Sequence, residues 1–146
     1  MVDREVPDPR HAAPDGVAEA TVAAVGKLSE ALETVERARG MLYSFHQLIG
    51  HADLMLDEAV ALFRAAGHPE FATEVTRNLI GRNVVEDSWT FQLVEQFDDG
   101  YWEPFRDTER RARHRFMAGR RHVYEARMRA RRAHLPETGP EFRWKS

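Results

Sequence analysis

Residues 41–67 read MLYSFHQLIGHADLMLDEAVALFRAAG and contain the clearest helical signal in the chain. Their apolar residues recur in steps of three and four, at Leu42, Phe45, Ile49, Ala52, Leu56, Ala59 and Phe63. Such steps place one row of side chains along a single face of an α-helix, whereas a strand alternates every second residue. Gly67 suits the left-handed position that follows a helix, and Pro69 suits the first turn of the next. The stretch therefore predicts a helix that ends at Ala66, with Gly67 directly after it.

The same spacing extends upstream through Val25, Leu28, Leu32 and Val35, and Asp15 is a plausible N-cap. A helix of roughly 50 residues would be about 75 Å long, which is longer than a single-domain core needs. Gly40 is the weak point, because a glycine inside a helix costs about 1 kcal/mol. Two arrangements follow. Either one long helix bends near Gly40 and projects beyond the core, or residues 17–39 fold back.

Downstream, helical spacing predicts two further helices, over residues 69–98 and 104–133, separated at Gly100. The predicted fold is therefore an all-α bundle of three principal helices, which completes a four-helix bundle alone or as a dimer. We expect a single helical domain over residues 15–134. The proline-containing and polar segments 1–14 and 135–146 are predicted to be a disordered N-terminal tail and an irregular C-terminal tail.

Two features favour a protein partner. If the first helix projects, its apolar residues Leu28, Leu32 and Val35 have no neighbour within the chain, and a homodimer that pairs these projections would cover them. Tyr101 and Trp102 lie at the predicted turn, where full burial is difficult, and aromatic residues of this kind often anchor interfaces.

Charge is distributed unevenly. Residues 101–135 contain 11 arginines and 4 acidic residues, whereas residues 1–100 contain 8 basic and 18 acidic residues. Clustered arginines can bind a polyanion by neutralising phosphates. The candidate residues are Arg110, Arg111, Arg113, Arg115, Arg120 and Arg121. The alternative is internal pairing, because a hairpin about Gly100 would lay the basic helix against the acidic one.

The residues that resemble a metal site are His46, His51 and Glu58. His46 and His51 are five residues apart, so they lie on different faces of a helix. The Glu-x-x-His spacing of carboxylate-bridged metal bundles does not occur in the chain. Gly-x-Ser-x-Gly and a glycine-rich phosphate loop are likewise missing. We therefore predict no cofactor, no resident metal and no catalytic residue.

LPETG, residues 135–139, matches the sequence that sortases cleave, but PEFRWKS follows it without an apolar segment. The chain has no cysteine, no apolar signal segment near residue 1 and no stretch long enough to span a membrane. We therefore expect a non-enzymatic helical interaction or scaffold protein of the bacterial cytoplasm. A nucleic-acid or other polyanion binder is the alternative, and a ligand- or metal-dependent helical-bundle enzyme is the third hypothesis.

Overall fold

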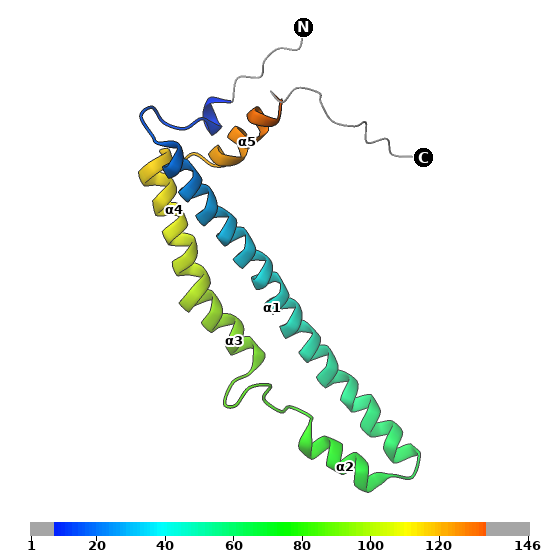
Figure 1. Cartoon of the computed structure of the whole chain (residues 1–146). Coiled ribbons are helices and arrows are strands. Elements are labelled where there is room, and N and C mark those ends of the chain that lie inside the picture. The colour runs from blue at the N-terminus through cyan, green and yellow to red at the C-terminus, as the bar shows by residue number, and fades with distance from the viewer. Residues whose placement is uncertain (1–7, 134–146) are drawn as a thin grey trace, which may run out of the picture. The chain divides into compact units, whose positions relative to one another are not determined.

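The computed structural model describes residues 8–133, and most of them are helical (Figure 1). The elements are η1 (Pro9–His11, a 3-10 helix), α1 (Glu19–Ala65), α2 (Pro69–Asn78), α3 (Thr90–Phe97), η2 (Asp98–Trp102, a π-helical turn), α4 (Glu103–Met117) and α5 (Val123–Ala133). Within the described range, β pairing is limited to one isolated bridge between Val85 and Ser88. The predicted all-α, bundle-like fold is confirmed.

The described residues group into two compact units. Within the described range, unit 1 combines residues 8–32 with residues 107–133, and unit 2 is residues 33–106. Helices α1 and α4 contribute residues to both units. The sequence predicts a single domain over residues 15–134. Of the two predicted tails, residues 1–7 and the LPETG-containing segment lie outside the described residues, while η1 begins inside the predicted N-terminal tail.

Unit 1 is built around a small apolar core. Val22 and Val25 of α1 pack with Met117 at the end of α4 and Val123 at the start of α5. Tyr124 closes this core over Gly26, where an added Cβ would lie 2.6 Å from the Cβ of Tyr124. The first turns of α1 therefore have neighbours within the chain, which a projecting helix would lack. Leu28 and Leu32 in unit 1 and Val35 in unit 2 are half-buried.

Unit 2 buries Val60 of α1, Ala72 of α2 and Val94 of α3. The ring of Phe63 meets that of Phe71 edge-on, with 5.0 Å between their centroids. The contact between Phe63 and Phe71 packs α2 against the end of α1.

The end of α1 is as predicted, and its interior is not. Gly67 has the left-handed φ of +85°, and Pro69 opens α2. Helix α1 runs unbroken through Gly40, so the fold-back of residues 17–39 is wrong. The helix begins at Glu19, four residues after the predicted cap Asp15.

The predicted helix over residues 69–98 is interrupted between Asn78 and Thr90. Gly81 and Asp87 have positive φ values of 67° and 59°. The backbone N–H of Gly81 donates to a carboxylate oxygen of Asp53 at 2.8 Å, so a side chain of α1 satisfies a backbone group that a helix would have paired. A tertiary hydrogen bond thus stabilises this break.

The predicted turn at Gly100 is wrong, because the chain continues through η2 from α3 into α4. The rings of Phe97, Tyr101 and Phe105 follow one another at centroid distances of 5.6 and 5.9 Å. Each is four residues from the next, which is the spacing of neighbours on one helix face. A helical run here also removes the predicted hairpin, and with it the predicted internal pairing of basic and acidic helices.

The helix instead breaks later, between α4 and α5. Ala118, Gly119 and His122 all have positive φ, at 50°, 75° and 59°. The predicted helix over residues 104–133 is therefore two helices, α4 and α5. Among the described helices, none has the length and apolar content needed to cross a membrane.

Candidate protein-interaction surface

Four large apolar side chains of α1 point away from the core of unit 2. Met41, Leu48, Met55 and Leu62 are 67%, 66%, 67% and 62% exposed. They are spaced by seven residues, so they form one row along the helix. Four smaller or less exposed residues complete the row in alternating steps of three and four. We call the whole set the outer seam, and it comprises Ala38, Met41, Phe45, Leu48, Ala52, Met55, Ala59 and Leu62.

A second row on α1 lies one residue further along the chain, and therefore about 100° around the helix. It comprises Leu42, Ile49, Leu56 and Phe63, all half-buried in unit 2. The sequence prediction merged the two rows, since it assigned Phe45, Ala52 and Ala59 to the core-facing row. It did not recognise Met41, Leu48, Met55 and Leu62. Two heptad series offset by one residue were the signal that could have identified them.

An open groove of about 600 Å³ adjoins the outer seam within unit 2. Its α1 wall includes Ile49, Ala52 and Leu56, and its other wall is the segment between α2 and α3 with Trp89 at the end. Trp89 is 68% exposed, and Leu79, Val84 and Val85 beside it are also exposed. Ala52 belongs to both the seam and the groove, so the two form one continuous apolar surface.

Two polar contacts hold the groove in place. Asp53 accepts from the backbone of Gly81, as described above, and a ring nitrogen of His46 lies 2.7 Å from the hydroxyl of Thr90. The His46 ring also contacts Phe91 at a centroid distance of 5.8 Å. The predicted metal candidate His46 therefore links α1 to the start of α3.

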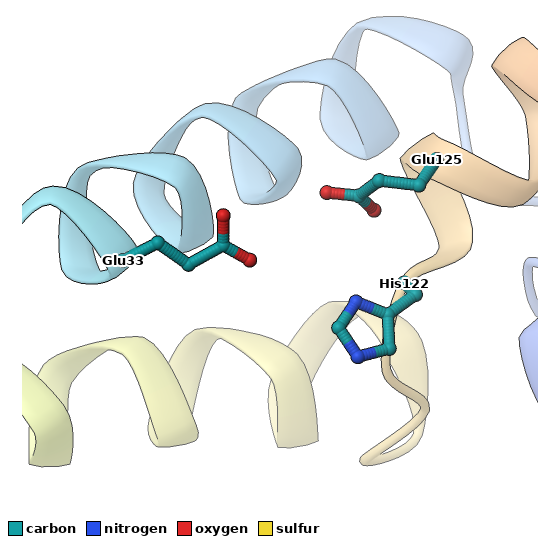
Figure 2. Close-up of side chains that lie close together, drawn as sticks. All are labelled: Glu33, His122 and Glu125. Carbon is teal, nitrogen blue, oxygen red and sulfur yellow. The ribbon is translucent and has the colours of Figure 1, made fainter. Parts of the chain in front are cut away.

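The other two metal candidates, His51 and Glu58, are exposed on α1. No group of described residues with metal-binding geometry contains His46, His51 or Glu58. His122 and Glu125 have the reverse of the Glu-x-x-His spacing; His122 lies directly before α5 and Glu125 lies in its first turn, both in unit 1 (Figure 2). Glu33, drawn in the same figure, belongs to unit 2.

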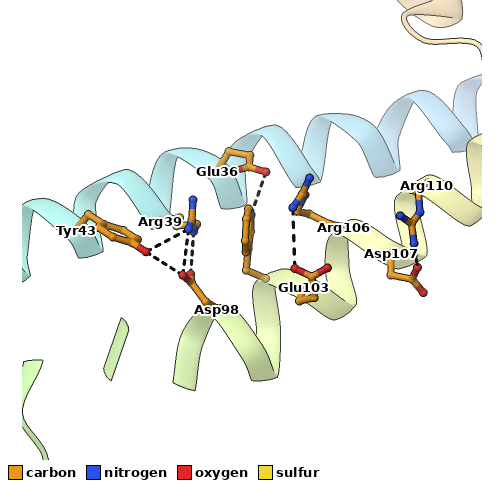
Figure 3. Close-up of polar contacts among 9 residues, drawn as sticks. Glu36, Arg39, Tyr43, Asp98, Glu103, Arg106, Asp107 and Arg110 are labelled. Atoms are coloured by element: carbon orange, nitrogen blue, oxygen red, sulfur yellow. Dashed lines mark hydrogen bonds and ion pairs between the residues drawn. The ribbon is translucent and has the colours of Figure 1, made fainter. Parts of the chain in front are cut away.

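Trp102, one of the two predicted interface aromatics, is engaged within unit 2 by Glu36, Arg39 and Arg106, which are labelled in Figure 3. Its indole N–H donates to Glu36 at 3.0 Å, and the guanidinium carbons of Arg39 and Arg106 lie 3.7 and 4.5 Å from its ring centroid. A ring between two guanidiniums is a favourable cation–π arrangement. Tyr101, the other predicted anchor, is 52% exposed and contacts Phe97 and Phe105 on its own helical run.

Arg39 also forms the main ion pair of unit 2. Its guanidinium donates to both carboxylate oxygens of Asp98, at 2.8 and 3.0 Å, and the Tyr43 hydroxyl donates to the same carboxylate at 3.0 Å. These hydrogen bonds, with the one from Arg39 the stronger cause, hold the pKa of Asp98 below its usual value of 3.8. The cluster fixes η2 to α1 and leaves the outer seam uncovered.

The six arginines predicted to bind a polyanion have different surroundings. Arg113 pairs with buried Glu109 at 2.7 Å, and Arg120 donates to the carbonyl of Ala12 at 2.8 Å. Arg110 and Arg111 share Asp107 and are 63% and 71% exposed at the side chain. Arg115 lies over the ring of Phe116, and Arg121 is exposed. Two of the six thus have structural roles within unit 1, and the others remain on its surface.

No protein-family model, curated protein or solved structure matches this chain. The interpretation of its surface therefore depends on the physical chemistry of its own residues.

Proposed function

We propose that the protein is a non-enzymatic helical interaction protein, and that the outer seam of α1 with the adjoining groove is its binding surface. The main observation is an imbalance in unit 2. Three apolar residues, Val60, Ala72 and Val94, are buried there, whereas 14 of the 16 large apolar side chains that are exposed in the described residues belong to this unit. Burying one such side chain contributes roughly 1.5–3 kcal/mol, so a partner that covers this surface gains a large driving force.

The spacing of the seam indicates the kind of partner. Apolar residues in alternating steps of three and four match the side-chain ridges of another α-helix, which can pack knobs into holes along the row. A flat or irregular partner surface has no side-chain ridges that match this helical spacing. The proposed ligand is therefore a protein helix. The bacterial cytoplasm stays our prediction for where the two proteins meet.

The test compares two variants on the same helix. The double variant Leu48→Glu/Met55→Glu places charges on the seam, and Leu54→Glu places one on a position that is 69% exposed but lies on another face of α1. Each is expressed as a tagged chain in a bacterial host together with an untagged copy, and all captured proteins are quantified. We expect the seam variant to lose protein partners that the wild type and Leu54→Glu retain. Identical capture by all three chains would contradict the proposal.

A second candidate function is polyanion binding by unit 1. It is supported by the exposure of Arg110 and Arg111, whose side chains share the single carboxylate of Asp107. Arginines with so little internal compensation can neutralise phosphates.

This candidate is tested with a short random DNA duplex at two salt concentrations. Replacing Arg110, Arg111, Arg115 and Arg121 by glutamine should abolish a salt-sensitive shift, while replacing Arg106, which lies over Trp102 in unit 2, should not. Affinity that is unchanged by the quadruple replacement excludes the basic surface as the binding site.

A further inference from the structure

The outer seam has an internal symmetry that points to its occupant. Its eight residues form four pairs that are equidistant from Gly50 along α1. The pairs are Ala38 with Leu62, Met41 with Ala59, Phe45 with Met55, and Leu48 with Ala52. If a second α1 is laid antiparallel on the first and centred at Gly50, every seam residue therefore meets a seam residue of the other helix. A foreign helix would not require this symmetry.

The sizes of the paired side chains agree with the same arrangement. In three of the four pairs an alanine stands opposite a leucine or methionine, so large and small side chains would alternate across the interface and fill space evenly. A parallel pair would instead bring alanine onto alanine and methionine onto methionine. The remaining pair joins Phe45 to Met55, and methionine is flexible and makes favourable sulfur–aromatic contacts.

The residues flanking the seam are compatible with this pairing. No charged residue belongs to the seam itself. In the antiparallel arrangement Glu58 of one copy is level with Leu42 of the other, and His51 is level with Ile49. Like carboxylates are not brought together, which removes a repulsion that would oppose association.

We propose that the outer seam is a homodimer interface in which the α1 helices of two copies pack antiparallel, with the two-fold axis level with Gly50. This inference rests on the proposed function, because it names the helix that covers the proposed surface. It differs from the dimer expected from the sequence, which used Leu28, Leu32 and Val35. Since the interface is isologous, each copy contributes the same residues and the assembly closes at two chains.

The chain has no cysteine, so single cysteines report the geometry directly. Chains with Ala38→Cys and chains with Leu62→Cys, of different mass, are mixed in equal amounts and oxidised mildly. We expect the cross-linked product to join one chain of each kind. Leu54→Cys, on another face of α1, is the matched control and should cross-link with neither. Circular dichroism confirms that each variant is folded.

The outcomes separate the possibilities. Cross-links only between like chains would show a parallel pair and overturn the antiparallel geometry. Light scattering supplies the second readout, where Leu48→Glu should weaken dimerisation by roughly 100-fold or more and Leu54→Glu should leave it unchanged. A wild-type chain that is monomeric, together with no cross-link between the Ala38→Cys and Leu62→Cys chains, overturns the second copy as occupant. In that event, partner loss by the seam variant in the capture experiment would still support the proposed function.

Discussion

Glu109 is buried in unit 1, with 7% of its side chain exposed, and its charge is compensated inside the same unit. It accepts from Arg113 at 2.7 Å and from the hydroxyl of Ser29 at 3.0 Å. A buried carboxylate is tolerated only when it is paired and hydrogen-bonded. The sequence prediction gave Arg113 a role in polyanion binding, but the structure places its guanidinium on Glu109. The basic pattern of α4 is thus in part a structural requirement.

The Arg113→Met variant should be strongly destabilised, because it leaves the Glu109 carboxylate buried without its cation. We expect a loss of about 3–5 kcal/mol in the free energy of unfolding, measured by urea denaturation. Adding Glu109→Leu should restore most of it, since both charges are then gone. Arg110→Met, which removes an exposed pair with Asp107, is the control and should cost less than about 1 kcal/mol. If the losses of stability caused by Arg113→Met and Glu109→Leu are additive in the double variant, the two side chains do not interact as proposed.

The ionisation of Asp98 makes the stability of the fold depend on pH in the acidic range. Its pKa is lowered in the folded state by the hydrogen bond from Arg39, so its ionised form favours folding. The stability it contributes is fully present above 3.8, the usual pKa, and is lost as the pH falls through the lowered folded value.

The Asp98→Asn variant should therefore be less stable than the wild type at neutral pH, by about 1–2 kcal/mol. The difference should shrink below pH 3.8 and vanish once Asp98 is protonated in both states. Urea denaturation at a series of pH values measures it. The Asp99→Asn variant, on the neighbouring exposed residue, is the control. A difference that stays constant down to the lowest pH would show that the carboxylate charge is not what Arg39 and Tyr43 stabilise.

At the scale of elements, the apolar periodicity of α1 predicted that the segment is helical but not which of its faces is buried. Spacing in threes and fours predicted a helix, and Gly67 and Pro69 predicted where it stops, because backbone geometry at those residues is local. Spacing alone did not separate the core-facing row from the outer seam. Both are apolar, and which one is buried depends on where α2 and α3 pack.

Gly40 offers a test of α1 as one continuous helix. Nothing lies within 4 Å of a Cβ added there, so the Gly40→Ala variant gains helix propensity without a clash. We expect it to raise the melting temperature by about 2–4 °C, corresponding to about 1 kcal/mol. Gly26→Ala is the contrasting variant in the same helix, and its Cβ would meet Tyr124, so it should lower the melting temperature. A loss of stability in Gly40→Ala would indicate that the helix is not continuous at this residue.

The breaks in the other helices could not be predicted from local signals alone. The segment between Asn78 and Thr90 is held open by Asp53, a residue far away in the chain, and Gly81 is a weak signal without that contact. At Gly100, by contrast, the chain stays helical although glycine commonly ends a helix. The flanking aromatic rings and the ion pair of Asp98 with Arg39 stabilise this helical run. Tertiary contacts override propensities of about 1 kcal/mol.

At the scale of the whole molecule, the proposed dimer would couple folding to association through the exposed apolar surface of unit 2. If the seam binds a second copy, the dimer is stabilised by mass action and its unfolding depends on concentration.

The melting temperature of the wild type should therefore rise by about 2 °C for each tenfold increase in protein concentration. The Leu48→Glu variant should show no such rise over the same range, and Leu54→Glu should behave as the wild type does. Differential scanning calorimetry at a series of concentrations provides the measurement. A concentration-independent wild type would argue against a dimer that is coupled to folding.

The sequence by itself determined the helical class, the end of α1 just before Gly67 and the basic composition of α4 and α5, because periodicity, backbone conformation and charge are properties of the chain. The tertiary structure decided which residues are buried. It joined Val22 and Val25 to Met117 and Val123, placed His46 against Thr90, enclosed Trp102 between two arginines and left the outer seam of α1 exposed. The physical reason is that burial depends on which helix faces meet, and this follows from the sum of contacts between segments far apart in the chain.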